Sequence, residues 1–522
     1  MDHRLTRLIA MASSSVLVLT ILAAAPAAVR AGTTAYIGDG TGSGECETPD
    51  YLTNGSADDV VFDIAVDAVD GDIDNILYVC PGTYDIEEQI DVPGALTIEG
   101  VSGAAATVLD SDGTSRILQL DGDAIIRGLT FKDGDTGGPG NGGAIRSGGA
   151  EGLTVEDSVF VNNEGGSGGA IYTNGDLDLI SNSTFSNNSA DVDGGAVFVG
   201  DDIIDINEDG ESGLIGNTFS GNTADDEGGA VHIAGEVIDS EISGNDFSAN
   251  SAEDRGGAVF VLNEFNGSLL SSNSFDGNHA DDDGGAFFLD DDFENGSQIL
   301  DNTFSNNTSW DDGGALMLYY DMDAGTLISG NTFVGNEGDL DDDDDGEGGG
   351  LQIDEDAAGT ISNNVFTGNE AGEGGGLYIG DLHGTAVITM NTFRSNIATD
   401  EGGGAWIDDE GGESSELAIF TKNSFRGNLA TDSGGGLYLQ FNDTELAPRY
   451  FTRNMYRSNR AGLGGAIAFK GLGSDDVECS AALTSNRAAA RIFKKDRFAS
   501  NRATGSRRSA NVGLVVPCLV AP

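Results

Sequence analysis

The chain contains 522 residues, including 80 glycines, 24 phenylalanines and four cysteines. Its 88 acidic residues outnumber its 24 basic residues and give a formal net charge of −64 at pH 7. Because phosphate backbones are bound by basic surfaces, we expect no nucleic-acid partner. The charge is also uneven: residues 32–448 contain 8 basic and 83 acidic residues, whereas residues 449–522 contain 13 basic and 4 acidic residues.

Residues 1–31 have the features of a secretory signal peptide. Arg4 and Arg7 precede an apolar stretch over residues 16–25, and Val29-Arg30-Ala31 is the candidate cleavage site before Gly32. An uncleaved membrane anchor is the alternative. No later run reaches the roughly 18 apolar residues of a membrane-spanning helix, so we expect no transmembrane segment in the mature chain.

Residues 32–140 are predicted to form an N-terminal cap and the first coils of a rod. Val60, Val61, Ile64, Ala65 and Ala68 follow a helical period, which indicates a short capping helix. Short apolar runs at 76–79, 96–100, 117–120 and 125–129 indicate successive strands.

Residues 141–503 repeat two sequence marks in phase. The first is a glycine pair followed by small and apolar residues, as in Gly194-Gly195-Ala196-Val197, and it occurs twelve times. The second is Phe-x-x-Asn, as in Phe185 and Asn188. The mean period is about 29 residues, with strand-like runs separated by Asp, Asn and Gly turns.

A unit of this length cannot bury its own apolar face, whereas stacked units bury a continuous core. The sequence therefore predicts an all-β fold, a right-handed parallel β-helix of about sixteen coils. At about 4.8 Å per coil the rod would be on the order of 75 Å long. The repeated Phe side chains would stack from coil to coil, and the Asn amides would bond to their neighbours at a turn.

The glycine-pair and Phe-x-x-Asn marks resemble the repeats of the chlamydial polymorphic membrane protein family. The opening, with Val79-Cys80-Pro81-Gly82-Thr83-Tyr84, is similar to the start of pectate-lyase-like β-helix proteins. The first resemblance implies a surface-exposed passenger associated with adhesion. Only residues 504–522, a basic tail, follow the last repeat, so we expect this chain to lack the C-terminal autotransporter barrel of that family.

The four cysteines allow three pairings. On a rod, two of these pairings would join opposite ends, while a disulfide spans Cα atoms only ~4.4–6.8 Å apart. We therefore predict two disulfides, Cys46–Cys80 and Cys479–Cys518.

Two acidic loops resemble the first half of an EF-hand loop and are candidate calcium sites. They are Asp205-x-Asn207-x-Asp209 and Asp341-x-Asp343-x-Asp345. The acidic residue expected at loop position 12 is absent, since Gly216 and Gln352 occupy those places. A solvated turn is the alternative, and calcium is the only cofactor that the sequence suggests.

Acidic turns also precede the glycine pairs, and stacking would align them into a ridge along the rod. The turns contain Asp191, Asp193, Asp225, Asp226, Glu227, Glu253, Asp254, Asp281, Asp282, Asp283, Asp311, Asp312, Asp400 and Glu401. Their mutual repulsion predicts that calcium or high salt raises the melting temperature and that chelation in low salt lowers it.

No catalytic constellation is evident. The three histidines of the mature chain, His232, His279 and His383, fall at different phases of the repeat and suggest no cluster. Polysaccharide lyases on this fold use a basic residue beside acidic calcium ligands. The candidate bases are Arg116, Arg127, Lys132, Arg146, Arg255, Arg394, Lys422 and Arg426, of which Arg394 and Arg426 occupy equivalent repeat positions.

These features favour a secreted, non-enzymatic surface protein of adhesion type whose acidic rod binds an extracellular polysaccharide or another cell-surface partner. The alternative is a secreted polysaccharide lyase or epimerase of the pectate-lyase-like type. The protein is expected outside the cell, at the cell surface or associated with the outer membrane. The basic tail either docks on an acidic or anionic neighbour or remains without a partner. The sequence leaves the oligomeric state open.

Overall fold

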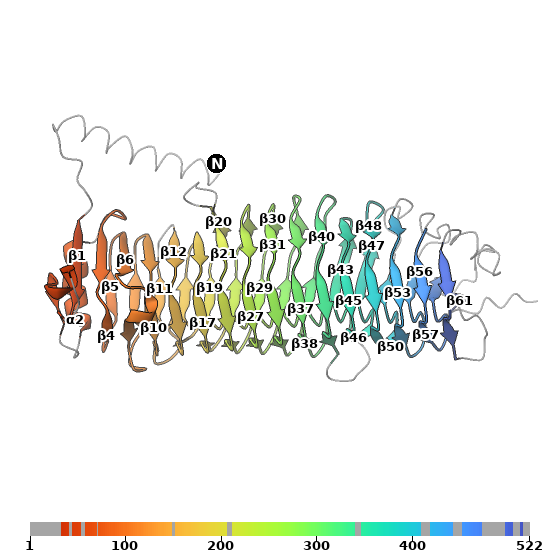
Figure 1. Ribbon diagram of the computed structural model, residues 1–522, viewed down its shortest axis with the longest axis horizontal. Coiled ribbons are helices and arrows are strands. Elements are labelled where there is room, and N and C mark those ends of the chain that lie inside the picture. The colour runs from red at the N-terminus through yellow and green to blue at the C-terminus, as the bar shows by residue number, and fades with distance from the viewer. Residues whose placement is uncertain are drawn as a thin grey trace, which may run out of the picture.

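The computed structural model describes residues 33–40, 44–53, 58–69, 71–148, 152–205, 211–339, 346–408, 418–441, 452–471, 496–504 and 512–514. The chain winds into a straight rod of parallel strands (Figure 1). Three sheets contain 15 strands each, a fourth contains 12, and a short fifth contains 4. The predicted fold class, an all-β parallel β-helix, is confirmed.

One coil from the middle of the rod shows how the chain turns. It runs through β24 (Val231–Ile233), β25 (Val237–Ile238), β26 (Glu241–Ser243), β27 (Asp246–Ser248) and β28 (Ser251–Ala252). Each strand pairs in parallel with the equivalent strand of the next coil, so that residues at the same position of successive coils are direct neighbours.

Two of the long sheets carry the features described below. We call the sheet that contains β24 sheet C and the sheet that contains β27 sheet B. Sheet C consists of β5 (Ile90–Val92), β8 (Leu118–Leu120), β11 (Ile145–Ser147), β15 (Ile171–Thr173), β19 (Val197–Val199), β24, β29 (Val259–Val261), β34 (Phe287–Leu289), β39 (Leu316–Leu318), β43 (Leu351–Ala357), β47 (Leu377–Leu382), β51 (Ala405–Ile407), β55 (Leu437–Phe441), β58 (Ile467–Gly471) and β61 (Val512–Leu514). Sheet B consists of β4 (Gly82–Asp85), β7 (Thr107–Asp110), β10 (Thr130–Lys132), β13 (Val159–Val161), β17 (Thr184–Ser186), β22 (Thr218–Ser220), β27, β32 (Ser274–Asp276), β37 (Thr303–Ser305), β41 (Thr332–Val334), β45 (Val365–Thr367), β49 (Thr392–Arg394), β53 (Ser424–Arg426), β56 (Met455–Arg457) and β59 (Arg497–Ala499).

The expected sixteen coils are one too many for these sheets of 15 strands. Sixteen coils require four before the first of the twelve glycine pairs, whereas among the described residues sheet C has two strands there, β5 and β8. The difference arises because the first part of the chain forms a cap instead of complete coils. One strand of sheet C, β61, follows the last marked repeat.

The cap contains the predicted helix, α2 (Asp59–Val69), at the N-terminal end of the rod (Figure 1). Phe62, Ala65, Val66 and Val69 are its buried apolar residues, and their spacing places them on one helical face. The Phe62 ring meets the Tyr84 ring edge-on at 5.4 Å. The helix therefore closes the apolar core at this end. Within the described residues, no helix is long and apolar enough to cross a membrane.

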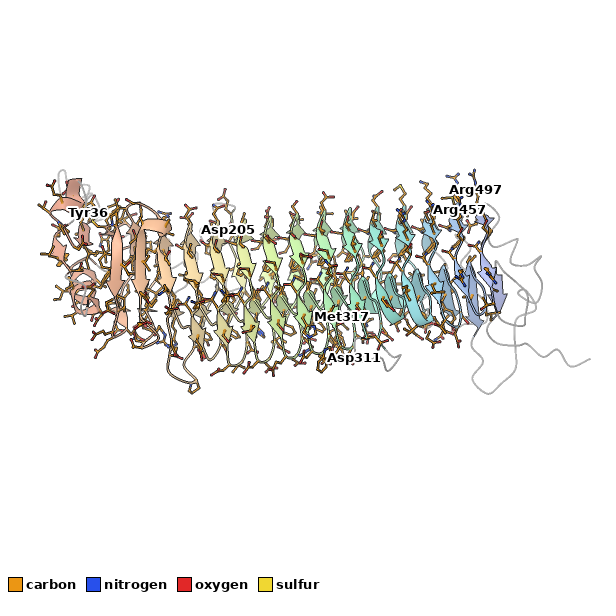
Figure 2. All side chains as sticks on the ribbon, turned by 60° about the horizontal axis from the view of Figure 1, so that its bottom comes forward. Tyr36, Asp205, Asp311, Met317, Arg457 and Arg497 are labelled. Carbon is orange, nitrogen blue, oxygen red and sulfur yellow. A yellow bond between two sulfur atoms is a disulfide. The ribbon has the colours of Figure 1, made fainter. Side chains whose placement is uncertain are left out.

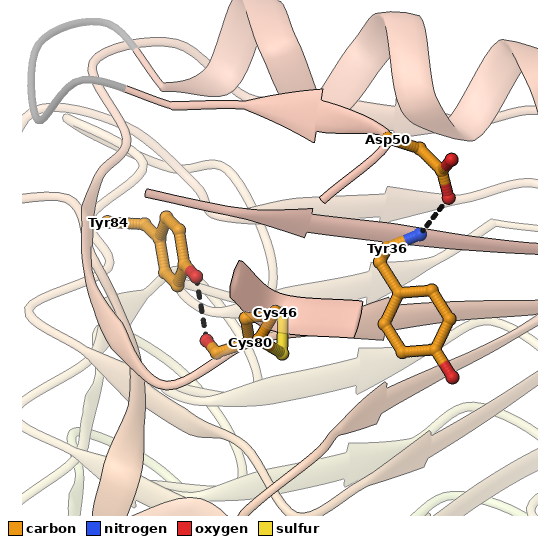
Figure 3. Close-up of a disulfide and its surroundings, with 5 residues drawn as sticks. All are labelled: Tyr36, Cys46, Asp50, Cys80 and Tyr84. Atoms are coloured by element: carbon orange, nitrogen blue, oxygen red, sulfur yellow. Dashed lines mark hydrogen bonds between the residues drawn. A yellow bond between two sulfur atoms is a disulfide. The ribbon is translucent and has the colours of Figure 1, made fainter. Parts of the chain in front are cut away.

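A disulfide joins Cys46 to Cys80, as predicted, with their Cα atoms 5.6 Å apart (Figure 3). It links the short helix η1 (Gly44–Glu47) to the turn that follows β3 (Ile76–Val79). The hydroxyl of Tyr84 donates a hydrogen bond to the carbonyl of Cys80 at 2.6 Å. The cap is thus tied covalently to the first coils. The predicted partners Cys479 and Cys518, like the signal segment, lie outside the described residues.

The core contains a continuous column of aromatic rings from sheet B. The column runs through Phe131, Phe160, Phe185, Phe219, Phe247, Phe275, Phe304, Phe333, Phe366, Phe393, Phe425, Tyr456 and Phe498. Successive ring centroids lie 4.6 to 5.1 Å apart with nearly parallel planes. This spacing is set by the distance between paired strands, which is about 4.8 Å. The predicted Phe stack is confirmed.

Two buried ladders of asparagine flank the aromatic column. The ladder from the Phe-x-x-Asn mark contains Asn163, Asn188, Asn222, Asn250, Asn278, Asn307, Asn336, Asn369, Asn396, Asn428, Asn459 and Asn501. The ladder from the Asn-x-Phe positions contains Asn217, Asn245, Asn273, Asn302, Asn331, Asn364, Asn391, Asn423 and Asn454. The amides bond from coil to coil, as the sequence predicts.

Asn307 illustrates the bonds of one rung. Its amide nitrogen donates to Oδ1 of Asn336 at 3.0 Å and to the carbonyl of Phe275 at 3.1 Å. Its own Oδ1 accepts from the backbone N–H and the amide nitrogen of Asn278 at 3.0 and 2.9 Å. Every polar atom of the side chain therefore connects coils, and a coil without its Asn would leave buried groups of its neighbours unpaired.

We predict that Asn307→Ala lowers the free energy of unfolding by at least about 2 kcal/mol, because several buried donors and acceptors lose their partner. Thr303→Ala, on the exposed face of the same coil, should cost less than about 1 kcal/mol. Chemical denaturation followed by circular dichroism measures both values. Equal losses for the two variants would contradict a special role for the ladder.

Candidate functional site

Each marked coil presents two positions on the outside of sheet C. One is the residue directly before the glycine pair or triplet, and the other is the second residue of the sheet C strand, five positions later. In one coil these are Asp193 and Phe198, and in the next coil they are Glu227 and His232. This second strand residue points away from the core because side chains alternate along a strand.

We call the first set the pre-glycine row. From Asp193 to Glu401 it contains Asp193, Glu227, Arg255, Asp283, Asp312, Glu347, Glu373 and Glu401. We call the second set the outer row. It contains Tyr172, Phe198, His232, Phe260, Phe288, Met317, Gln352, Tyr378, Trp406 and Tyr438.

The outer row forms a second aromatic stack, outside the main core. Phe198 and His232 stack with ring centroids 4.9 Å apart, and His232 lies 5.0 Å from Phe260. Phe260 and Phe288 are fully buried although they point away from the core. The guanidinium of Arg255 lies over both of these rings, at 5.0 and 5.1 Å from their centroids. Residues of the pre-glycine row therefore help to cover the outer row.

The glycine pair makes this arrangement sterically feasible. Gly194 has a φ of 64°, a conformation in which glycine is strongly favoured. A Cβ on Gly195 would lie 2.2 Å from the carbonyl oxygen of Gly229 in the next coil. The first glycine therefore turns the chain, and the second lets successive turns pack in contact.

Backbone hydrogen bonds hold the pre-glycine carboxylates in register. The N–H of Asp312 donates to Oδ1 of Asp283 at 3.1 Å, and the N–H of Glu347 donates to Oδ1 of Asp312 at 2.7 Å. Each carboxylate thus accepts a bond from the turn of the following coil. These acids are fixed in place and are not freely solvated.

Burial raises the pKa of these carboxyl groups. It raises the pKa of Asp283 to about 8, of Asp312 to about 7 and of Glu347 to about 9. Neighbouring carboxylates add to the effect of burial, Asp312 acting on Asp283 and on Glu347. The row therefore holds negative charge poorly, and a cation would relieve the unfavourable charge.

A more solvent-facing line of acids runs beside the pre-glycine row, and we call it the acidic ridge: Asp226, Asp254, Asp282 and Asp311. The N–H of each of the last three donates to the carbonyl of the one before, at 3.1, 3.0 and 3.2 Å. Burial raises the pKa of Asp226 and of Asp282, and the Asp254 carboxyl raises both further. The predicted stacking of acidic turns is confirmed for these four coils.

The structure brings His232 together with two carboxylates of the pre-glycine row. Its Nδ1 lies 3.9 Å from Oδ1 of Asp193 and 3.7 Å from Oε2 of Glu227. Arg255 binds the other oxygen of Glu227 and also contacts Asp290 Oδ1 at 3.0 Å. Burial lowers the pKa of His232 to about 3, so the imidazole is neutral at physiological pH.

The expectation that the histidines form no cluster is therefore wrong for His232. The group is not evident in the sequence because its members come from two coils whose lengths differ. The available signal was a histidine at a position that is aromatic in most coils, five residues after Glu227, in a coil that follows one with Asp193 at the same pre-glycine position.

The predicted calcium loops stay a prediction. Asp205 directly follows β20 (Ile203–Ile204). The other five residues, Asn207, Asp209, Asp341, Asp343 and Asp345, lie outside the described residues.

Four of the candidate bases contact residues of neighbouring coils: Arg116, Arg127, Lys132 and Arg146. Arg116, for example, donates to the carbonyls of Asn141 and Gly142 at 2.9 and 3.0 Å. These contacts give the four residues a structural role between coils.

Arg394 and Arg426 behave differently, because they are exposed and stack on one face as predicted. Arg394 pairs in register with Arg426 on the next strand of sheet B, and Arg426 pairs with Arg457. All three side chains are exposed. We call these three residues the basic row. Figure 2 shows Arg457, with Arg497 nearby, at the C-terminal end of the rod. The rod therefore has a basic end and an acidic middle.

Two family models match parts of the chain. A right handed beta helix region matches residues 293–444, and the Chlamydia polymorphic membrane protein repeat matches residues 182–200 and 218–234. The chain thus carries polymorphic membrane protein repeats within a β-helix, as the sequence marks indicate. The two matched repeats include Asp193, Glu227 and His232.

No curated protein matches the chain. Among solved structures, the A-module of mannuronan C-5 epimerase AlgE6 from Azotobacter vinelandii is similar at 13% sequence identity. The match covers 90% of this chain and 98% of that module, with a TM-score of 0.28. At this TM-score the likeness carries no argument about function.

We predict that, in the presence of a chelator, the protein is more stable at pH 5 than at pH 9. A carboxyl group with a raised pKa in the folded state contributes stability below its unfolded pKa of about 4. This contribution is lost as the pH rises through about 8 for Asp283 and about 9 for Glu347. Melting temperatures across this range measure the effect.

The double variant Asp283→Asn/Glu347→Gln should flatten the pH dependence and gain at least about 1 kcal/mol at pH 9 relative to the parent. Asp246→Asn, an exposed acid of sheet B, is the matched control and should leave the profile unchanged. A parent profile that rises from pH 5 to pH 9 would contradict the prediction.

Proposed function

We propose that the protein is a secreted, surface-displayed β-helix of adhesion type, which acts without catalysis by presenting its acidic ridge to an extracellular partner. The observation that carries this proposal is the alignment of Asp226, Asp254, Asp282 and Asp311 on successive coils by backbone hydrogen bonds. A regular row of identical groups suits a partner that is itself repetitive. The polymorphic membrane protein repeats support a location at the cell surface.

The chemistry of the ridge indicates how such a partner would bind. Two carboxylates about 4.8 Å apart repel by roughly 0.9 kcal/mol even at the dielectric constant of water. Divalent calcium prefers carboxylate oxygens and can accept ligands from two molecules at once. We therefore propose that calcium bridges the ridge to the carboxylates of an anionic extracellular polysaccharide.

The basic row supplies a second, calcium-independent contact. Exposed Arg394, Arg426 and Arg457 on adjacent strands repel one another unless an anion lies against them. We propose that this end of the rod contacts an anionic polymer on the producing cell, which leaves the acidic ridge free for the external partner.

The full mature chain should bind to pectate-coated beads in calcium and should be released by a chelator. Asp254→Asn/Asp282→Asn should reduce this retention at least about threefold, because it removes adjacent carboxylates from the ridge. Glu241→Gln/Asp246→Asn changes the net charge equally on a different face and is the matched control.

The same assay separates the alternative function, since unsaturated sugar products in the supernatant would identify a lyase and overturn the proposal. An equal loss of bead retention in both variants would show that the acidic ridge is not the binding face.

For the basic end, retention on a heparin column in chelator isolates the contact that does not need calcium. Arg426→Gln/Arg457→Gln should elute at a markedly lower salt concentration than the parent, because two of the aligned charges are lost. Arg127→Gln/Arg146→Gln, near the other end of the rod, makes the same change in net charge and should elute with the parent. Co-elution of the Arg426→Gln/Arg457→Gln variant with the parent would refute the anchoring role.

A further inference from the structure

His232 is an anomaly in the outer row. Its neighbours in the row are Phe198 on one side and Phe260 on the other, and its ring lies between theirs at 4.9 and 5.0 Å. The side chain is only 5% exposed, yet its Nδ1 has no hydrogen-bond partner. A phenylalanine would fill this place without burying an unpaired nitrogen, so the imidazole requires an explanation.

The orphaned nitrogen faces two carboxylate oxygens. One ligand atom from each of Asp193, Glu227 and His232 lies within 4.8 Å of the other two. The distances from Nδ1, 3.9 and 3.7 Å, are too long for hydrogen bonds. Ligand atoms about 2.0–2.1 Å from a tetrahedral zinc ion are separated by roughly 3.4 Å. Small inward movements of the side chains would therefore close these three atoms around one ion.

The set of donor atoms distinguishes this group from the acidic ridge. An imidazole nitrogen with two carboxylate oxygens suits a divalent transition metal, whereas calcium takes six to eight oxygen ligands. The equivalent positions in the next two coils hold Arg255 with Phe260 and Asp283 with Phe288, neither of which supplies a nitrogen ligand. Within the outer row as the structure describes it, His232 is the one histidine, so this donor set is particular to this pair of coils.

Arg255 positions one of the ligands. Its guanidinium binds Oε1 of Glu227 and reaches Oδ1 of Asp290, which leaves Oε2 of Glu227 directed at His232. Outer partners of this kind orient metal ligands in many proteins. The Asp193 and Glu227 side chains remain 20% and 14% exposed, so an ion can enter from solvent and keep one position for water or an external ligand.

We propose that Asp193, Glu227 and His232 form a binding site for one divalent transition-metal ion, held between two adjacent coils. This site is separate from the calcium-bridged ridge of the proposed function. Zinc is the probe for its affinity, and cobalt is the probe for its geometry.

The full mature chain, in millimolar calcium to occupy the exposed acids, is titrated with zinc against a chromophoric chelator. We expect one tight site per chain. His232→Phe should weaken zinc binding more than about 100-fold, because loss of a direct ligand exceeds the 10–100-fold effect of an outer partner. This variant continues the Phe row, so its metal-free melting temperature should equal or exceed that of the parent. Asp283→Asn, an equivalent pre-glycine acid opposite a phenylalanine, is the control and should bind zinc like the parent.

X-ray absorption of the zinc-loaded and cobalt-loaded protein should show one imidazole with oxygen ligands. The proposal is overturned if the parent has no site that competes with the chelator, if His232→Phe binds zinc as tightly as the parent, or if the spectra contain no imidazole. Calcium-dependent retention on pectate beads is measured on the same variants. If His232→Phe is still retained on the beads, zinc binding at this site and the proposed function are independent of each other.

Discussion

The hydrogen bonds between asparagine amides of successive coils are the constraint on which the rest of this structure depends. A side-chain amide buried beside the aromatic column must be paired, and the atoms that pair it belong to the coils before and after it. Each coil is therefore compatible with its neighbours only in one register. The aromatic column supplies apolar burial, but stacked rings tolerate sliding more readily than the directional bonds of an amide do.

A fixed register turns any single position of the repeat into a row. Acids that precede the glycine pair become a line of carboxylates, and the arginines of β49, β53 and β56 become a line of guanidinium groups. Such lines of like charge are unfavourable. Burial increases the cost of ionising the acidic line, and it raises the pKa values of Asp283 and Glu347. The buried asparagine hydrogen bonds hold the coils together against this repulsion. The surface can therefore keep like charges close together that would move apart in a less constrained fold.

The sequence predicted the features that depend on one coil repeating the next. The Phe-x-x-Asn mark predicted both the ring column and the amide bonding. The apolar period over residues 60–69 predicted the capping helix but not its buried face, because Val60 and Ile64 are exposed whereas Phe62 and Val66 are buried. The sequence did not predict how the coils begin, because the cap consumes residues that were expected to form coils. The sequence also did not predict that His232 lies beside Asp193, since this contact joins two coils of unequal length. The burial of the pre-glycine acids was not predicted for a related reason. An acidic turn within one repeat indicates a solvent-exposed turn, and its burial depends on the packing of the next coil.

The direction of the strands has a mechanical consequence. Strands run around the rod, so the backbone hydrogen bonds between them lie along its axis, and a pull on the two ends loads all the bonds of one coil boundary together. The asparagine bonds cross the same boundary and share that load. Because consecutive boundaries are built alike, tension is distributed evenly along the shaft, and the first boundary to open would be the one with the fewest such bonds. A rod of this construction resists stretching through a series of similar boundaries, and it would open first between two neighbouring coils.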